Sequence, residues 1–203
     1  NASGVVESNK TIGTGYIVKG AVYTKPAGLK YITVEQVGAG AAGEGEISSD
    51  SGGSGGAAAG YAKKLIAASA LSSTVDYSIG YHATGTNTTS TQVAGRTIFN
   101  HSSPITTTGG TGATTPGTAT GGDINITGQK GGGHASNSSG ADIGGVGGST
   151  LLGIGGAALD TTADGNVGTG YGSGGGGGLT TSTTDVLGGN GADGVIILTE
   201  YFN

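Results

Sequence analysis

Short runs of β-branched and aromatic residues recur along this 203-residue chain, each bounded by Gly, Asn or Ser. Such runs are typical of β-strands. They predict strands at residues 31–37, 75–79, 124–127 and 195–202. The first and the last are the strongest, and we expect them to pair as antiparallel neighbours, because this pairing buries the strand edges of a single β unit.

Two other segments have a weaker pattern. Residues 1–24 contain Val5, Val6, Val22 and Tyr23 between glycines, and they are predicted to be an extended lead-in that precedes a turn at 25–28. Residues 25–203 are predicted to form one compact domain. Residues 61–71 have some helical propensity, but their neighbours favour a strand, which is the prediction adopted for them.

Glycine separates these strands, with 48 residues in total. Several glycines recur at every third position, as at Gly172, Gly175 and Gly178, and three residues is the repeat of the polyproline II conformation. Bundled polyglycine II helices would satisfy the backbone without side chains. The alternative is that such a composition yields these triplets by chance. The predicted fold is therefore all-β, a small antiparallel β-sandwich or jelly-roll-like scaffold with glycine-rich insertions that form polyglycine II-type helices.

Charge and cysteine content narrow the possible partners. The net charge is −5 and charged residues make up 10% of the chain, so we expect no nucleic-acid partner. No apolar run approaches the length of about 20 residues that a membrane helix needs, so no membrane insertion is expected. There is no cysteine, and stability must come from assembly with other chains or from a hydrogen-bonded glycine lattice.

Two glycine motifs resemble ligand sites. Residues 38–43 match G-x-G-x-x-G after a strand, but the following residues favour no helix, and a dinucleotide site needs one. Residues 188–196, which include Asp193, match the nonapeptide of calcium-binding β-rolls, but those sites need tandem copies. The three histidines lack metal-ligand spacing. We therefore predict no metal, no cofactor and no catalytic residue, and hence a protein that is not an enzyme.

The stretch from Tyr81 to His101 interrupts the low-complexity pattern with aromatic and hydrogen-bonding side chains. Loops of this composition over a rigid base are used to bind glycans or protein epitopes. The predicted ligand-binding residues are Tyr81, His82, Arg96, Phe99 and His101, and the next candidates are Tyr171 and His134. The alternative is that Ile98 and Phe99 belong to a strand that faces the core.

The order of several short motifs resembles a known family. These motifs are KPAG at 25–28, a strand ending in VGAG at 37–40, GYAKK at 60–64, GGDINI at 121–126 and GADGVII at 191–197. Together they resemble the glycine-rich C-terminal domains of bacteriophage tail fibres and of related bacterial fibre proteins. The resemblance covers residues 25–202.

The resemblance implies an extracellular, receptor-binding fibre tip, on a virion or a bacterial surface, that is homotrimeric and recognises a bacterial glycan or outer-membrane protein. Residues 1–24 would then lead in from the fibre shaft. Two alternatives stay open, a structural capping or trimerisation module without a ligand and an ice-binding protein. The latter would need a regular flat face, which the interrupted glycine triplets do not supply.

Overall fold

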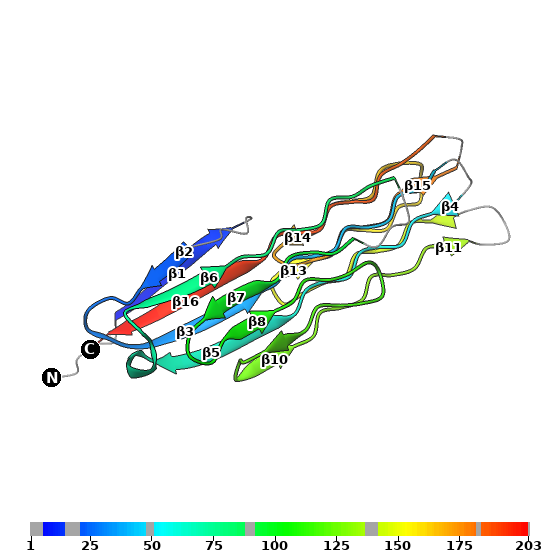
Figure 1. Ribbon diagram of the computed structural model, residues 1–203. Coiled ribbons are helices and arrows are strands. Elements are labelled where there is room, and N and C mark those ends of the chain that lie inside the picture. Colours follow the sequence, from blue (N-terminus) through cyan, green and yellow to red (C-terminus); the bar gives the residue numbers. More distant parts are fainter. Residues whose placement is uncertain are drawn as a thin grey trace.

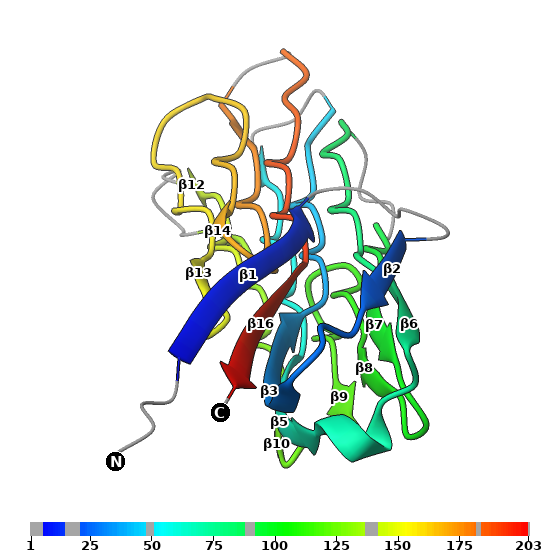
Figure 2. The ribbon, with the colours of Figure 1, turned by 90° about the vertical axis from the view of Figure 1, so that its left-hand side faces the viewer.

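The computed structural model describes residues 6–14, 21–47, 51–87, 92–136, 142–181 and 184–202. The molecule is elongated, with paired strands at one end and the glycine-rich segments at the other (Figure 1). The strand-rich end consists of two antiparallel five-stranded sheets, seen side by side in Figure 2. The predicted all-β class is confirmed, and the only helical element in the described residues is a single 3-10 turn, η1 (Ala68–Ala70).

The first sheet joins the two ends of the described chain. Its strand order is β1 (Val6–Thr14), β16 (Val195–Phe202), β3 (Leu29–Val37), β5 (Tyr61–Ala67) and β10 (Ile124–Ile126). β16 and β3 are antiparallel neighbours, with Val195 opposite Val37 and Tyr201 opposite Tyr31. The predicted pairing of the two strongest strands is therefore confirmed, as is the strand predicted at the start of 61–71.

The second sheet is a meander with one added strand. Its order is β2 (Ala21–Thr24), β6 (Thr74–Ser78), β7 (Thr97–Asn100), β8 (Ile105–Thr107) and β9 (Ala119–Thr120). The segment between β3 and β16 is thus more than insertion, because it supplies most strands of the sandwich. β1 and β2, which the sequence places in a lead-in, pair with β16 and β6 and belong to the sheets. That residues 1–24 connect the domain to a fibre shaft stays a prediction.

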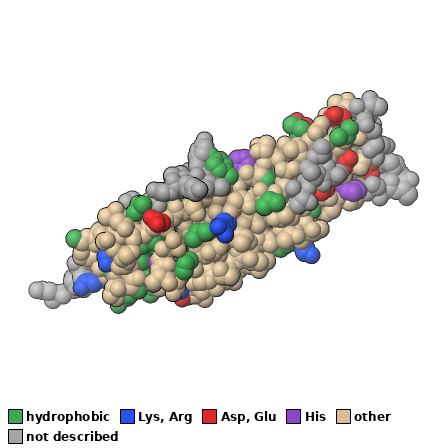
Figure 3. Space-filling model, viewed as in Figure 1, with side chains coloured by type: hydrophobic (Ala, Val, Ile, Leu, Met, Phe, Trp, Pro, Cys, Tyr) green, Lys and Arg blue, Asp and Glu red, His purple; other side chains and the backbone are tan. Residues whose placement is uncertain are grey.

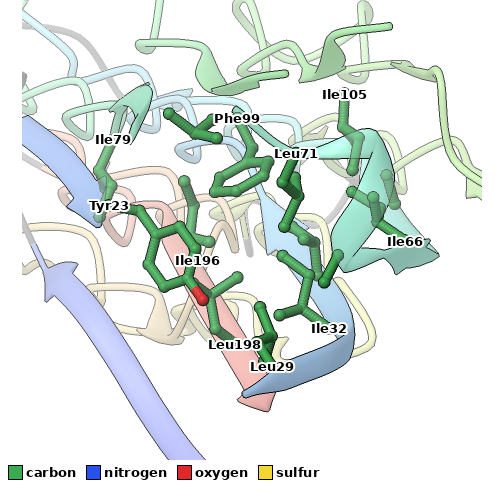
Figure 4. Close-up of a cluster of buried hydrophobic side chains, with 14 residues drawn as sticks. Tyr23, Leu29, Ile32, Ile66, Leu71, Ile79, Phe99, Ile105, Ile196 and Leu198 are labelled. Carbon is green, nitrogen blue, oxygen red and sulfur yellow. The ribbon is translucent and has the colours of Figure 1, made fainter. Parts of the chain in front are cut away.

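The core of the sandwich lies between the two sheets (Figure 4). Side chains alternate across each strand, so Ile32 and Val34 of β3 are buried in it while Tyr31 and Thr33 lie on the outer face. Phe99 of β7 is 0% exposed and is the largest fully buried side chain. A smaller cluster covers part of the outer face of the first sheet, where Leu152 and Tyr171 pack against Val37, Tyr61 and Val195.

Three short strand pairs stiffen the glycine-rich part. β4 (Ser51–Gly52) pairs with β15 (Leu179–Thr180), β11 (Ala135–Ser136) with β12 (Asp142–Ile143), and β13 (Gly153–Ile154) with β14 (Thr169–Gly170). Leu152 and Tyr171, which pack on the outer face of the first sheet, directly flank the last of these pairs.

The glycine-rich segments continue the sandwich strands along the length of the molecule (Figure 1). Residues 38–47 follow β3, residues 51–60 precede β5 and residues 184–194 precede β16. Their backbone bonds recur at every third residue: the N–H groups of Gly53, Gly56 and Ala59 donate to the carbonyls of Gly178, Gly175 and Gly172. Those of Gly55 and Ala58 donate to a different segment, at Gly132 and Gln129. This period of three is the one that the polyglycine II interpretation requires.

The close spacing of these segments explains why so many of their residues are glycine. A Cβ atom added at Gly175 would overlap the carbonyl oxygen of Gly189, and one at Gly191 would overlap the carbonyl oxygen of Gly40. Every described backbone group in such a packed lattice needs a partner, because burial without one is costly. At these two positions only a residue without a side chain lets the neighbouring carbonyl come close enough.

Candidate binding surfaces

The five predicted site residues do not gather in one place. Phe99 and His101 are buried, and their rings lie 6.1 Å apart between centroids. Phe99 also lies 6.1 Å from the ring of Tyr23, within the core (Figure 4). Neither Phe99 nor His101 can contact a receptor on the folded domain, so this part of the prediction is wrong. The alternative of a core-facing strand holds for Phe99, because it alternates with the outward residues of β7.

His101 has a structural environment. Its Nδ1 accepts a hydrogen bond of 3.2 Å from the backbone N–H of Ser103. Burial, and secondarily the charge of Lys64, lower the pKa of His101. The ring is therefore neutral at physiological pH, with Nδ1 as the acceptor.

Tyr81, His82 and Arg96 lie outside the core on neighbouring segments. The N–H of Gly95 donates to the carbonyl of Tyr81 at 2.8 Å, which places the segment carrying Arg96 beside Tyr81. Arg96 is exposed, and Tyr81 and His82 are partly buried. The rings of Tyr81 and His82 meet edge to face with centroids 6.2 Å apart.

His82 is held by Asp193. The carboxylate oxygen Oδ1 of Asp193 lies 2.6 Å from Nδ1 of His82 and also accepts the backbone N–H of His82 at 3.0 Å. Nδ1 therefore carries the proton that faces the carboxylate, and Nε2 is the acceptor nitrogen of the neutral ring. Both side chains are partly exposed to water, 29% for His82 and 28% for Asp193, so this pair fixes the orientation of the ring more than it adds stability.

Asn190, three residues before Asp193, also accepts a backbone N–H with its side-chain oxygen. Its Oδ1 accepts the backbone N–H of Gly85 at 2.8 Å. Between the two side chains, the N–H of Gly191 donates to the carbonyl of Ala83. Asn190 and Asp193 thus take the place of backbone carbonyls in the lattice and fasten the chain that carries His82.

These contacts also involve the two glycine motifs of the sequence. The carboxylate of Asp193 is engaged by His82, and no group of three His, Cys, Asp or Glu side chains in the described residues is placed to hold a metal ion. Residues 38–43 run as a lattice segment, where Gly40 donates to the carbonyl of Ala192 and Gly43 to that of Gly189, and no helix follows in the described residues 44–47 and 51–67. The nucleotide site thus lacks its helix terminus.

A groove of about 320 Å³ opens beside His82. It is lined by His82, Tyr171, Asn190 and Asp193, together with Val167 and small residues of the two segments. We call it the His82 groove. Sequence reasoning named His82 and placed Tyr171 among the next candidates. It missed that Asn190 and Asp193 hold the segment carrying His82. Their spacing of three residues, which equals the period of the lattice, could have indicated this role.

The other next candidate, His134, is exposed and lies beside Gly52, outside this groove. On the face seen in Figure 3, acidic side chains gather toward the far end of the glycine-rich part.

A larger groove, of about 580 Å³, lies on the outer face of the first sheet. It occupies the half of that face that Leu152 and Tyr171 leave open. Its floor includes Tyr31 and Leu65, and its rim includes Lys30, Lys63 and Ile124. We call it the Tyr31 groove. The motifs GYAKK at 60–64 and GGDINI at 121–126 contribute residues to it, but the sequence does not predict the groove, because its residues come from four strands that are distant in the chain.

No known family model matches the chain, and no curated protein matches it. Among the described residues, no helix has the length and apolar character needed to cross a membrane.

Proposed function

We propose that this chain is the non-enzymatic, receptor-binding tip of an extracellular fibre, and that it recognises a bacterial cell-surface glycan or outer-membrane protein. The observation that carries the proposal is the His82 groove, where an imidazole, a tyrosine ring, one amide and one carboxylate meet on a backbone lattice. A few convergent polar groups beside aromatic rings are what a recognition site needs. The resemblance to phage and bacterial fibre domains supports the same function.

The geometry suits attachment by many weak contacts. The described ends of the chain lie together, because Val6 pairs with Phe202, and the glycine-rich part extends away from that end (Figure 1). A fibre joined at this end would hold the His82 groove away from its shaft. In a homotrimeric fibre several copies would act together, so avidity compensates for low affinity per site.

The test uses the domain multimerised on a fluorescent scaffold and a broad panel of bacterial cells. We expect the intact multimer to label target cells, and the double substitution His82→Ala with Tyr171→Phe to abolish labelling. Tyr171→Phe keeps the ring that packs on Val37 and Val195, so the melting temperature should hold. His134→Ala, at an exposed histidine outside the groove, is the matched control.

Undiminished labelling by the double variant would contradict the site, and loss of labelling by His134→Ala would move it to the far end. An intact multimer that labels no cell in the panel would favour the alternative, a structural capping or trimerisation module without a ligand.

A further inference from the structure

The Tyr31 groove, which is not part of the proposed receptor site, exposes several large apolar side chains. Tyr31 is 49% exposed, Leu65 57% and Ile124 50%, on the outer face of one continuous sheet. Large apolar side chains that lie together and face solvent mark binding surfaces more often than isolated ones do. A volume of about 580 Å³ falls within the range of small-ligand sites.

The groove carries charge of both signs. Lys30, Lys63 and Lys64 line it together with Asp123, in a chain whose net charge is −5. Lys63 is paired with Glu35 at 3.5 Å, and the ammonium of Lys64 donates to the carbonyl of Gly121 at 2.8 Å. Lys30 has no ion pair or hydrogen bond with any described residue, so its charge is available to an anion.

The groove is also rigid. Tyr31 and Tyr201 face each other across β3 and β16, and the hydroxyl of Thr33 lies 3.4 Å from that of Tyr201. Two hydrogen bonds hold Asp123 against β5 on one side of the groove. Its Oδ2 accepts the N–H of Leu65 at 2.9 Å, and its own N–H donates to the carbonyl of Lys63. A ligand therefore meets a preformed surface and loses little affinity to reordering of the protein.

The polar groups decide what kind of anion fits. An acyl chain laid over Tyr31 and Leu65 would also cover the hydroxyls of Thr33 and Tyr201 and the carboxylate of Asp123, and unpaired buried polar groups are costly. A sugar ring has an apolar C–H face for the tyrosine floor and hydroxyls at its edge for those polar groups. A carboxylate on the sugar would meet Lys30.

We propose that the Tyr31 groove binds an acidic saccharide, with the sugar ring packed on Tyr31 and Leu65 and its carboxylate against Lys30. This site is separate from the His82 groove and does not depend on the proposed receptor function. An acidic sugar also differs from the other possible occupants, an anionic lipid and a second copy of this chain, in ways that one experiment separates.

The experiment titrates the intact chain with a tetrasaccharide of alternating glucuronic acid and N-acetylglucosamine and follows backbone amides by NMR. We expect shifts at Tyr31, Leu65 and Ile124, and weaker binding to the same tetrasaccharide with its carboxyls reduced to alcohols. Lys30→Gln should weaken binding of the acidic form by up to about fivefold, the range of an exposed ion pair. Lys130→Gln, at an exposed lysine outside the groove, should leave it unchanged.

Equal binding of the acidic and reduced sugars would overturn the proposal, as would shifts that map elsewhere. Sedimentation that shows concentration-dependent dimers, lost in Tyr31→Ser, would make the face an interface between copies. Binding to phosphatidylglycerol vesicles without binding to the tetrasaccharide would assign it to lipid. Because His82→Ala leaves this groove intact, the sugar titration of that variant separates failure of this site from failure of the receptor site.

Discussion

At Gly175 the space beside the Cα atom is occupied by the carbonyl oxygen of Gly189. Many individual positions in this protein are constrained by such contacts, which leave room for glycine and for no larger residue. Gly133, in contrast, has no atom within 4 Å of where its Cβ would lie. The two positions therefore form a matched pair with the same residue type in different surroundings.

We expect Gly175→Ala to destabilise the protein by about 3 kcal/mol or more, because the methyl group must push two hydrogen-bonded segments apart. Gly133→Ala should change stability by less than about 1 kcal/mol, and can raise it by limiting the unfolded chain. Thermal unfolding of both variants measures the difference. Equal, small shifts would show that the tracts are loops and not a packed lattice.

Asn190 is a second position where a single side chain contributes to the stability of the lattice, here through a hydrogen bond. Since its Oδ1 accepts the N–H of Gly85, we expect Asn190→Ala to be destabilising. Loss of that acceptor should cost about 1 kcal/mol, well below the loss expected for Gly175→Ala.

His101 predicts a pH dependence of stability. Its pKa is lowered by burial in the folded state, while in the unfolded chain it titrates near its usual value of about 6.5. Below that pH the unfolded state binds more protons, so stability is lost as the pH falls, by at most about 1.4 kcal/mol per pH unit. The measurement is the free energy of unfolding between pH 7.5 and 5, compared with His101→Gln, whose profile should be flatter. Parallel profiles would contradict the prediction.

At the scale of elements, the two sheets are joined by polar bonds as well as by the apolar core. The hydroxyl of Tyr23, on β2, donates to the carboxylate of Glu200, on β16, at 2.9 Å. Both side chains are buried, and burial together with this carboxylate raises the pKa of Tyr23. Gln36 of β3 makes a second link, because its Nε2 donates to the carbonyls of Thr97 and Ile105 in the other sheet.

Tyr23→Phe should therefore lower the free energy of unfolding by about 2 kcal/mol, because it leaves the carboxylate of Glu200 buried without this donor. Tyr31→Phe removes the same hydroxyl from a half-exposed ring and should change stability by less than about 0.5 kcal/mol. Denaturant unfolding of both variants is the test. Similar losses of unfolding free energy in the two variants would show that the hydrogen bond between Tyr23 and Glu200 does not stabilise the fold.

At the scale of the whole molecule, the sandwich and the lattice share their chain segments. Residues 38–47 leave β3 and residues 184–194 enter β16, so the lattice segments cannot separate while these strands stay paired. The lattice has few large apolar side chains of its own, and the buried cluster formed by Ala39, Ala42, Ala83 and Ala94 contains only alanines. We expect it to depend on the sandwich for stability.

Calorimetry should accordingly show one transition for the chain. Phe99→Ala, which removes the largest side chain of the sandwich core and should cost about 3–5 kcal/mol, should also accelerate amide hydrogen exchange at Gly56 and Gly175 in the lattice. Two separate transitions, or unchanged exchange at these glycines, would show that the lattice folds by itself.

The sequence alone determined the two strongest strands and the spacing of the glycines. β-Branched and aromatic runs identify β3 and β16, since a strand's preference for such residues is local, and their pairing follows from the need to bury strand edges. The recurrence of glycine at every third position was also readable, because it reflects a backbone period and not a contact with one particular residue.

Only the tertiary structure decided which side chains are available for binding. Phe99 and Tyr31 are both aromatic residues on strands, yet Phe99 points into the core and Tyr31 points outward, and the type of residue does not tell them apart. His82 acquires its partner from Asp193, 111 residues away. Both grooves arise where segments distant in sequence are brought side by side, so their composition depends on packing and register, which propensity does not encode.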